Sequence, residues 1–571
     1  MAHLKPLLAF AVALLLVPRG RGSCRTAPAA LHPSGHRALR QVLVAGNDSL
    51  ASEPGAAATA TAAPTPTKSP SEAGHSEPAS SGSDAVDQAA EGAVKVYAEH
   101  TEPDYSQPWQ RGKSHSSRSS GVMMLGPDGE PLVCTNAHSV EYATQVQVKR
   151  RSDDTRFEAR VVAAGRDCDL ALLAVDDETF WENATFARFG GLPAIRDRMT
   201  VVGFPIGGEQ VSVTQGIVSR MEVTGYSLAW RELLALQIDA SINPGNSGGP
   251  VFNDEGEVVG LAFQALTSAE NIGYVVPSEI MAHFFEDVHL NGTFTGFPDL
   301  GLQLQRMESP ALRAAYNMSE GEQGLLVRLV YPLGSCAGQV QQGDVLTKFD
   351  GVDVASDGTV PFRGEERIDL SYLVSQRFVG DTADVEVLRD GQLVQLQIQL
   401  KAPDWLVPVS LKGALPSYLM VGGLVINVLS APFMFSEYGS VGGSPTGLQD
   451  QLWFGVKNQT DEQVLVLSQI LASDATTGYE RYSDIQGRNA QIHTFNGRPV
   501  RSLLQLAREV VTCEAPYMAF GVDHNEEVIL ETAAVQNATA DVMAVHAIPS
   551  FASKDIVDAL GKEGVLKEPT A

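Results

Sequence analysis

Short apolar runs alternate with Gly, Asn, Asp and Pro positions from about residue 93 to residue 286. Short runs separated by turn residues are typical of an all-β barrel or sandwich. The pattern predicts a closing helix near Ser278 and strands at 145–149, 159–163, 170–175, 200–204, 216–223, 234–238, 250–252, 258–263 and 273–276. We therefore expect the first globular part of the chain to be mainly β.

Two later segments repeat a pattern of strand, hairpin turn and strand. Gly343–Val354 and Asn489–Val500 each contain an Asp-Gly or Asn-Gly pair directly after a phenylalanine. Such pairs favour tight hairpins because both turn residues tolerate positive φ. Amphipathic helices are expected after them, at 368–378 and 502–511. An internal repeat of this kind predicts a tandem of small α+β domains.

The N-terminal segment has a different composition. A basic residue before an apolar run at 6–17, which is too short to span a membrane, is typical of a signal peptide, expected over 1–23. Arginines then continue without an acidic residue until Asp48, as in transit peptides. Residues 24–92 are expected to be transit-like sequence and disordered linker, because they offer few large apolar side chains to bury. The secretory pathway, the chloroplast and the mitochondrion stay open as destinations.

One further apolar stretch, Tyr418–Phe435, reaches almost the length of a membrane span. It is interrupted by Gly, Asn, Ser and Pro residues, so we expect buried strands of the second repeat in its place. No membrane-spanning segment is predicted.

Length and charge narrow the function classes. A chain of 571 residues is too long for a single core and suggests three or four units. Its net charge of −27 argues against a nucleic-acid partner, which requires clustered Lys and Arg. No P-loop motif is present, so ATP is not implied. The 5 cysteines are scattered, with no spacing typical of a metal site, and we expect no metal and no cofactor.

The candidate chemistry centres on Ser247, within Gln237–Phe252. A serine needs a base to accept its proton and fixed donors to stabilise the oxyanion that forms on the attacked carbonyl. Gly245 and Gly248 permit the positive φ that lets successive N–H groups point at one spot. The loop backbone of Gly245, Asn246 and Ser247 is therefore expected to form an oxyanion hole. The alternative is a simple glycine turn between two strands.

Two upstream residues complete a possible triad. His138 follows an apolar run and Asp169 precedes one. Taken alone, each has a structural explanation, as a hydrogen-bonding histidine or a solvated turn aspartate. Together with the serine they predict a base and its orienting carboxylate. The order His, Asp, Ser is that of the chymotrypsin-like double barrel and differs from those of subtilisin and the α/β-hydrolases.

At this point the chain resembles the HtrA/DegP (Deg) serine proteases, and in particular the plant and algal Deg branch with a protease domain and two PDZ-like domains. The resemblance runs from about Val94 almost to the C-terminus. The segments that carry it are Thr135–His138, Asp169–Leu173, Val202–Gly207, Thr214–Ser219, Gly245–Pro250 and Asn271–Ser278.

The resemblance implies a mainly β architecture, with a chymotrypsin-like double β-barrel protease domain followed by two PDZ-like α+β domains. The protease domain would occupy 93–290, and the PDZ-like domains 298–402 and 403–548, leaving 549–571 as a C-terminal tail. His138 would be the general base, Asp169 its orienting partner and Ser247 the nucleophile.

The resemblance also implies binding sites. Ile242 and Phe263 would line the specificity pocket and favour small to medium aliphatic side chains. Gly324, Leu325, Leu326 and Val327 would offer backbone N–H groups to a peptide C-terminus and add the peptide as a strand. The second repeat has a similar run at Gly423–Ile426, but a long insert follows it. That domain could bind peptides or serve assembly.

The expected function is an ATP-independent serine endopeptidase that cleaves unfolded or damaged proteins and forms a homo-oligomer. An alternative from another class is a proteolytically inactive PDZ scaffold or chaperone-like protein. A processing protease with one dedicated target is a third possibility.

Overall fold

The computed structural model describes residues 82–566, apart from 152, 206–207, 209, 266–271 and 480–488. The targeting peptide expected over 1–23 and most of the expected linker lie outside the described residues. The end of the linker is helical, with α1 at Gly82–Ala89 followed by a 3-10 turn at Ala90–Gly92. Val86 and Ala90, four residues apart on one helix face, are buried in the core of the next domain.

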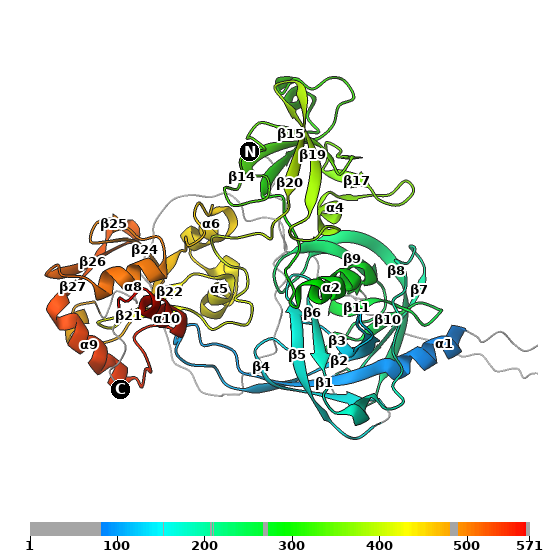
Figure 1. The fold of residues 1–571 in the computed structure, drawn as a ribbon, viewed down its shortest axis with the longest axis horizontal. Coiled ribbons are helices and arrows are strands. Elements are labelled where there is room, and N and C mark those ends of the chain that lie inside the picture. Colours follow the sequence, from blue (N-terminus) through cyan, green and yellow to red (C-terminus); the bar gives the residue numbers. More distant parts are fainter. Residues whose placement is uncertain are drawn as a thin grey trace, which may run out of the picture. The chain divides into compact units, whose positions relative to one another are not determined.

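The protease-like domain begins with a closed barrel whose strands are paired in the order β1-β2-β3-β6-β5-β4 (Figure 1). The strands are β1 Ala93–His100, β2 His115–Leu125, β3 Pro131–Thr135, β4 Ala143–Arg150, β5 Phe157–Gly165 and β6 Leu170–Ala174.

A second closed barrel follows, in the order β10-β11-β12-β9-β8-β7. Its strands are β7 Arg198–Gly203, β8 Ser212–Gly225, β9 Glu232–Ile238, β10 Pro250–Phe252, β11 Val258–Ala265 and β12 Gly273–Pro277. A 3-10 turn at Glu178–Trp181 lies between the barrels, and helix α2, Ser278–Asn291, closes the domain. The strands predicted from the short apolar runs are all present.

Alternation along the strands produces both the barrel interiors and the contact between the barrels. On β3, Val133 belongs to the interior of the first barrel, whereas its neighbour Cys134 faces outward. That outward cluster also contains Leu172 of β6, and Phe252 and Leu261 of the second barrel. The two barrels therefore share an apolar contact, and the polar loops beside it are held close to one another.

The first PDZ-like domain is a sheet in the order β13-β14-β15-β19-β20, with β16 paired to β15. Its elements are β13 Leu302–Arg306, α3 Pro310–Ala315, β14 Leu325–Val330, β15 Val345–Phe349, β16 Val352–Asp353, β17 Thr359–Pro361, β18 Arg367–Asp369, α4 Ser371–Ser375, β19 Thr382–Arg389 and β20 Gln392–Gln399. The helix expected at 368–378 is shorter, because its first residues pair as β18 with β17.

The second PDZ-like domain forms a sheet in the order β21-β22-β23-β24-β26-β27, with β25 paired to β24. The strands are β21 Tyr418–Val421, β22 Leu424–Val428, β23 Leu465–Ile470, β24 Ala490–Phe495, β25 Arg498–Pro499, β26 Tyr517–Val522 and β27 Glu527–Glu531. The helices are α5 Ala431–Tyr438, α6 Thr446–Phe454, α8 Leu503–Val511, α9 Thr532–Val545 and α10 Lys554–Lys562, with 3-10 turns at Val441–Gly443, Asp474–Thr476 and Asp523–Asn525.

The internal repeat is confirmed by the hairpins. Asp350 and Gly351 join β15 to β16 with φ of 48° and 77°, and Asn496 and Gly497 join β24 to β25 with φ of 48° and 75°. Both pairs have the positive φ values of a type I′ turn. With β15 and β24 taken as equivalent, the strand orders match β13 with β22 and β14 with β23, so β21 is an additional strand of the second domain.

The chain beyond residue 548, expected as a tail, contributes to the second domain. Ala552, Ile556 and Leu560 are buried in the same apolar cluster as the β21 residue Leu419. The Tyr418–Phe435 stretch forms buried strands and part of α5, as its Gly and Pro residues indicated. Among the described residues, no helix has both the length and the hydropathy needed to cross a membrane.

Candidate active site

Strand pairing brings His138 and Asp169 together from distant parts of the sequence. β3 and β6 are antiparallel neighbours with Thr135 opposite Ala171, so the end of β3 meets the start of β6. Asp169 lies just before β6 in a left-handed turn with φ of 53°. Its Oδ2 accepts from Nδ1 of His138 at 2.7 Å, and its Oδ1 accepts from the His138 backbone N–H at 2.9 Å. Both carboxylate oxygens are thereby directed at one histidine.

The electrostatics suit a histidine that serves as a base. Burial by itself would lower the pKa of His138, but the charge of Asp169 and the hydrogen bond to it outweigh burial and raise the pKa above its ordinary value. Asp169 is 1% exposed, whereas the His138 side chain is 38% exposed. Because Nδ1 is engaged by the carboxylate, Nε2 is the nitrogen left to exchange a proton with a partner.

The polar contacts around this pair fix the aspartate. Asn136, fully buried, donates from Nδ2 to the backbone carbonyl of Asp169 at 2.8 Å. Tyr226 is also fully buried, and its ring stacks on Phe263 at 4.6 Å. Its pKa is raised well above the ordinary value, chiefly by burial and further by the nearby Asp169 carboxylate, so the phenol stays neutral.

Ser247 lies in the loop between β9 and β10, next to the first barrel. Its carbonyl accepts from the N–H of Ser120 on β2 at 2.8 Å. A side chain at Gly248 would reach within 2.5 Å of Thr135 Oγ1 and 3.1 Å of Asn136 N, so the loop packs directly against the residues before His138. The structure contains no hydrogen bond between the side chains of His138 and Ser247, although their supporting residues are in contact.

The loop backbone forms a tight turn at Asn243–Asn246. The N–H of Asn246 donates to the carbonyl of Asn243 at 2.9 Å, and Gly245 has φ of 100°. Pro at the second position and a positive φ at the third define a type II turn, whereas a type I turn would need φ near −90° there. Among the described residues, the N–H groups of Gly245 and Ser247 have no acceptor. That of Asn246, also predicted as an oxyanion donor, is used by the turn.

The two residues predicted for the specificity pocket belong to different apolar clusters. Ile242 belongs to the interior cluster of the second barrel, and its side chain covers Gly273, where a Cβ would come within 2.7 Å of Cδ1. Phe263 belongs to a different cluster, with Tyr226. The physical reason is strand alternation, since Ala262 of β11 faces the barrel interior and Phe263 faces the other side.

The peptide-binding prediction at Gly324–Val327 is wrong. Leu325, Leu326 and Val327 are in β14, which is paired with β13 on one side and with β15 on the other. A strand with two neighbours has no free edge for a peptide. A Cβ on Gly324 would also lie 2.5 Å from the carbonyl oxygen of Leu346. Gly324 is therefore needed for packing inside the sheet.

The edge strands of this sheet are β13 and β20, and a groove of about 570 Å³ lies along β13. Residues from β13 and from the helical segment of α4 face each other across the groove, namely Leu302, Leu304 and Arg306 on one side and Ser371, Val374 and Ser375 on the other. Trp230 and Arg231 of the β8–β9 connection also line it. An extended peptide could pair with β13 while its side chains contact α4.

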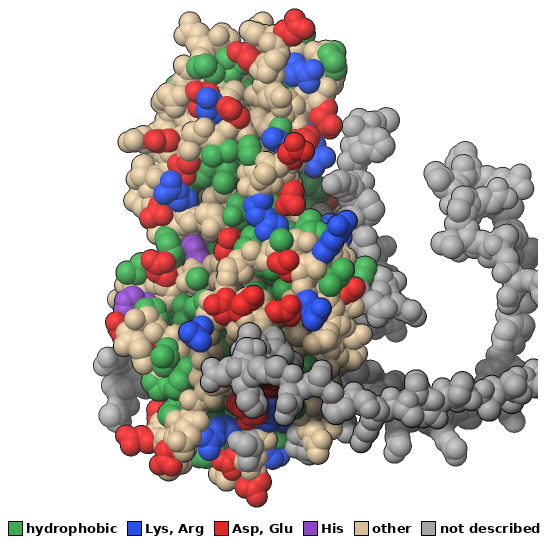
Figure 2. Space-filling view, turned by 90° about the vertical axis from the view of Figure 1, so that its right-hand side faces the viewer, with side chains coloured by type: hydrophobic (Ala, Val, Ile, Leu, Met, Phe, Trp, Pro, Cys, Tyr) green, Lys and Arg blue, Asp and Glu red, His purple; other side chains and the backbone are tan. Residues whose placement is uncertain are grey.

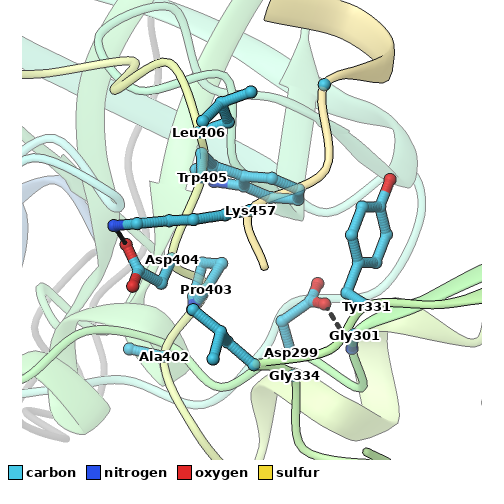
Figure 3. Close-up of a pocket in the computed structure, with 12 residues that line it drawn as sticks. Asp299, Gly301, Tyr331, Gly334, Ala402, Pro403, Asp404, Trp405, Leu406 and Lys457 are labelled. Carbon is cyan, nitrogen blue, oxygen red and sulfur yellow. Dashed lines mark hydrogen bonds and ion pairs between the residues drawn. The ribbon is translucent and has the colours of Figure 1, made fainter. Parts of the chain in front are cut away.

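A much smaller cavity, about 20 Å³, lies at the loop before β13 (Figure 3). It has room for about one water molecule and none for a peptide. Figure 3 shows Asp299 directed at the backbone nitrogen of Gly301, which donates to Oδ1 at 2.7 Å. Its other oxygen, Oδ2, accepts from Arg231 at 3.1 Å. These bonds hold the loop that leads into β13.

The corresponding groove of the second domain is filled by its own chain. β22, which matches β13, is covered on its outer edge by β21. β21 also lies against α8, so it takes the place that a peptide would occupy between strand and helix. The far edge of β21 is bonded in turn, because Met420 N–H donates to Phe551 O at 2.7 Å and Ser553 N–H donates to Tyr418 O at 3.0 Å. Gly423–Ile426 therefore offers no free edge.

Charges on the face shown in Figure 2 are mixed, with Lys and Arg side chains scattered among Asp and Glu. Among the described residues, no His, Cys, Asp and Glu side chains gather as ligands for a metal ion.

Two barrels with this arrangement between them define a trypsin-like peptidase, and sequence comparison agrees. The trypsin-like peptidase domain family matches residues 119–261, and the PDZ domain family matches 407–555. Protease Do-like 2, chloroplastic, from Arabidopsis thaliana is 43% identical over 81% of this chain and 75% of its own length. Putative protease Do-like 3, mitochondrial, from the same plant is 34% identical over 83% and 81%.

This chain belongs to the HtrA/Deg family of serine proteases, in its plant Deg branch. Among solved structures it is similar to the HtrA-type protease AlgW with decapeptide, with 26% identity, a TM-score of 0.45, and coverage of 57% of this chain and 99% of that one.

Proposed function

We propose that this chain is an ATP-independent serine endopeptidase that cleaves unfolded or damaged polypeptides. In this mechanism His138 takes the proton of Ser247 as the serine attacks a peptide carbonyl, and Asp169 holds the imidazole. The acyl-enzyme is then hydrolysed by water. The observation that carries the proposal is the pair of bonds from His138 to the buried Asp169, at 2.7 and 2.9 Å.

The turn at Asn243–Asn246 supports an oxyanion hole made by the backbone N–H groups of Gly245 and Ser247. In a type II turn the central peptide is reversed relative to a type I turn, so the sign of the Gly245 φ decides to which side its N–H points. The observed φ of 100° and the lack of a described acceptor for either N–H are what such a donor pair requires.

Substrate capture is assigned to the groove along β13. An unfolded chain can pair with a free strand edge, and the apolar side chains of Leu302 and Leu304 favour segments that are buried in folded proteins. The apolar Ile242 beside Gly273 favours a small to medium aliphatic residue at the cleavage site. Both preferences select unfolded substrates, in keeping with protein quality control in an organelle. A homo-oligomer is part of the same proposal.

The test is casein cleavage by the purified chain without added ATP, beside Ser247→Ala. We expect the variant to keep its fold and to lose activity by about 10⁶-fold, as in comparable triads. Equal cleavage by both proteins would refute the assignment of Ser247. If the wild type binds unfolded chains and never cleaves them, the scaffold function takes precedence.

A further inference from the structure

Ser120, on β2 of the first barrel, reaches into the loop that carries Ser247. It is fully buried, at 0% exposure. Its N–H donates to the carbonyl of Ser247 at 2.8 Å, and its Oγ donates to the carbonyl of Gly245 at 2.7 Å. The same Oγ accepts from the N–H of Phe204 at 2.8 Å. One buried serine is thus bonded to both residues assigned above as oxyanion donors.

The bond to Gly245 acts on the peptide that joins Gly245 to Asn246. The carbonyl of that peptide is held by Ser120, and its N–H donates to Asn243 at 2.9 Å. With both ends bonded, the peptide plane cannot rotate without loss of a buried hydrogen bond. The preceding peptide, which carries the Gly245 N–H, shares a Cα with this plane and is limited in its rotation.

The bond to Ser247 acts in the same way one step further along. The peptide that joins Ser247 to Gly248 has its carbonyl held by Ser120 and its N–H donating to Ala262 at 2.8 Å. The Ser247 N–H therefore belongs to a peptide with a fixed plane on each side. The peptide that carries the Ser247 N–H is itself held, because its carbonyl, that of Asn246, accepts from the N–H of Gly249 at 2.8 Å.

We propose that Ser120 is a positioning residue for the oxyanion hole, which holds the N–H groups of Gly245 and Ser247 in their outward orientation without touching substrate. The inference rests on the proposed function, because it needs Ser247 as nucleophile. Without the Ser120 hydroxyl, the Gly245 carbonyl and the Phe204 N–H are left buried and without partners. The Gly245–Asn246 peptide plane is then free to rotate, and the adjoining peptide that carries the Gly245 N–H loses its restraint.

Ser119 is a matched control on the same strand. It is 5% exposed and faces the opposite side of β2, and its buried Oγ has no hydrogen-bond partner among the described residues. Replacing either serine by alanine removes one oxygen from a buried site. Only Ser120→Ala removes hydrogen bonds to the loop.

The experiment compares the full-length wild type, Ser120→Ala, Ser119→Ala and Ser247→Ala on a short peptide substrate. We expect Ser120→Ala to lower kcat by about 10- to 100-fold, less than the 10²- to 10³-fold loss of a whole oxyanion donor, with KM unchanged. Affinity for a peptide aldehyde, which mimics the tetrahedral state, should fall by a similar factor. Ser119→Ala should stay within about 2-fold of the wild type in all three quantities.

Equal kcat for the two alanine variants would overturn the inference, as would a rise in KM with kcat and aldehyde affinity unchanged. If Ser120→Ala does not fold, Ser120→Cys provides the same test, because the slightly larger thiol leaves no cavity and offers a weaker hydrogen bond. An unchanged kcat in that variant would also overturn the inference. Activity in Ser247→Ala would instead refute the proposed function, so the two failures are distinguishable.

Discussion

His283 of α2 makes the stability of this protein depend on pH. Its ring is stacked between Phe297 and Phe378, at centroid distances of 4.4 and 4.1 Å. Its Nε2 is buried and has no hydrogen-bond partner among the described residues. Burial lowers the pKa of His283 to about 4, although the carboxylates of Asp287 and Asp381 act in the opposite direction. The folded protein therefore favours the neutral form of the His283 ring.

The magnitude follows from linkage between protonation and folding. As the pH falls, the unfolded chain takes up the proton near pH 6.5, well before the folded protein does near pH 4. The contribution of the neutral ring is complete above pH 6.5 and is lost as the pH falls from there toward 4. Between pH 7 and pH 5 the loss is about 2 kcal/mol in the free energy of unfolding.

The assay is urea unfolding at pH 7 and pH 5. Hydrogen exchange of the α2 amides then reports the stability of this segment, even where the domains unfold separately. His283→Phe keeps an aromatic ring in the stack and should remove about 2 kcal/mol of the pH effect. His289→Phe, at an exposed position on the same helix, should leave the effect in place. An equal drop in wild type and His283→Phe would refute the reasoning.

Three further outcomes are expected. Because Asp169 raises the pKa of His138, kcat/KM should fall with decreasing pH at a midpoint above 6.5, and a midpoint below that value would contradict the assigned pair. Leu304→Glu, in the groove along β13, should raise KM for unfolded casein by about 10-fold and leave KM for a short peptide unchanged. Gln305→Glu, on the exposed face of β13, should change neither KM value. Equal effects of the two variants would exclude the groove as the capture site. Leu560→Ala should lower the stability of the second PDZ-like domain by about 2 to 5 kcal/mol, measured by urea unfolding. Lys562→Ala, at an exposed position of α10, is the control. Equal stability of the two variants would show that α10 is dispensable.

Local chemistry explains why much of the architecture could be predicted from the sequence. Apolar runs bounded by turn residues indicated β4 to β12, since strand formation follows alternation and turn chemistry. The first three strands, β1 to β3, were not among the predicted ones. The Asp350-Gly351 and Asn496-Gly497 pairs indicated both hairpins, because a type I′ turn requires positive φ at two successive residues. The proximity of His138 and Asp169 was an expectation from the motifs, and pairing of β3 with β6 produces it.

Tertiary structure alone decided which strand edges are free. Gly324–Val327 and Gly301–Leu304 both begin with a Gly-Leu pair, and nothing local shows that β14 has two neighbours while β13 has one. In the second domain, the occupation of the groove by β21 depends on pairing between segments distant from α8 in sequence. Phe263 and Ile242 fall in different clusters for a related reason, because a strand residue's partners depend on which face meets the core.

The role of Ser120 was likewise invisible in the sequence, where it ends a polar run that resembles an exposed strand. Its proposed role rests on its hydrogen bonds to Gly245 and Ser247, which lie more than a hundred positions away in the sequence. The sequence by itself determined most of the strands, the hairpin turns and the candidate triad, because each depends on neighbouring residues. The tertiary structure decided the free edges, the filled groove and the support of the nucleophile loop, because those depend on contacts between distant segments.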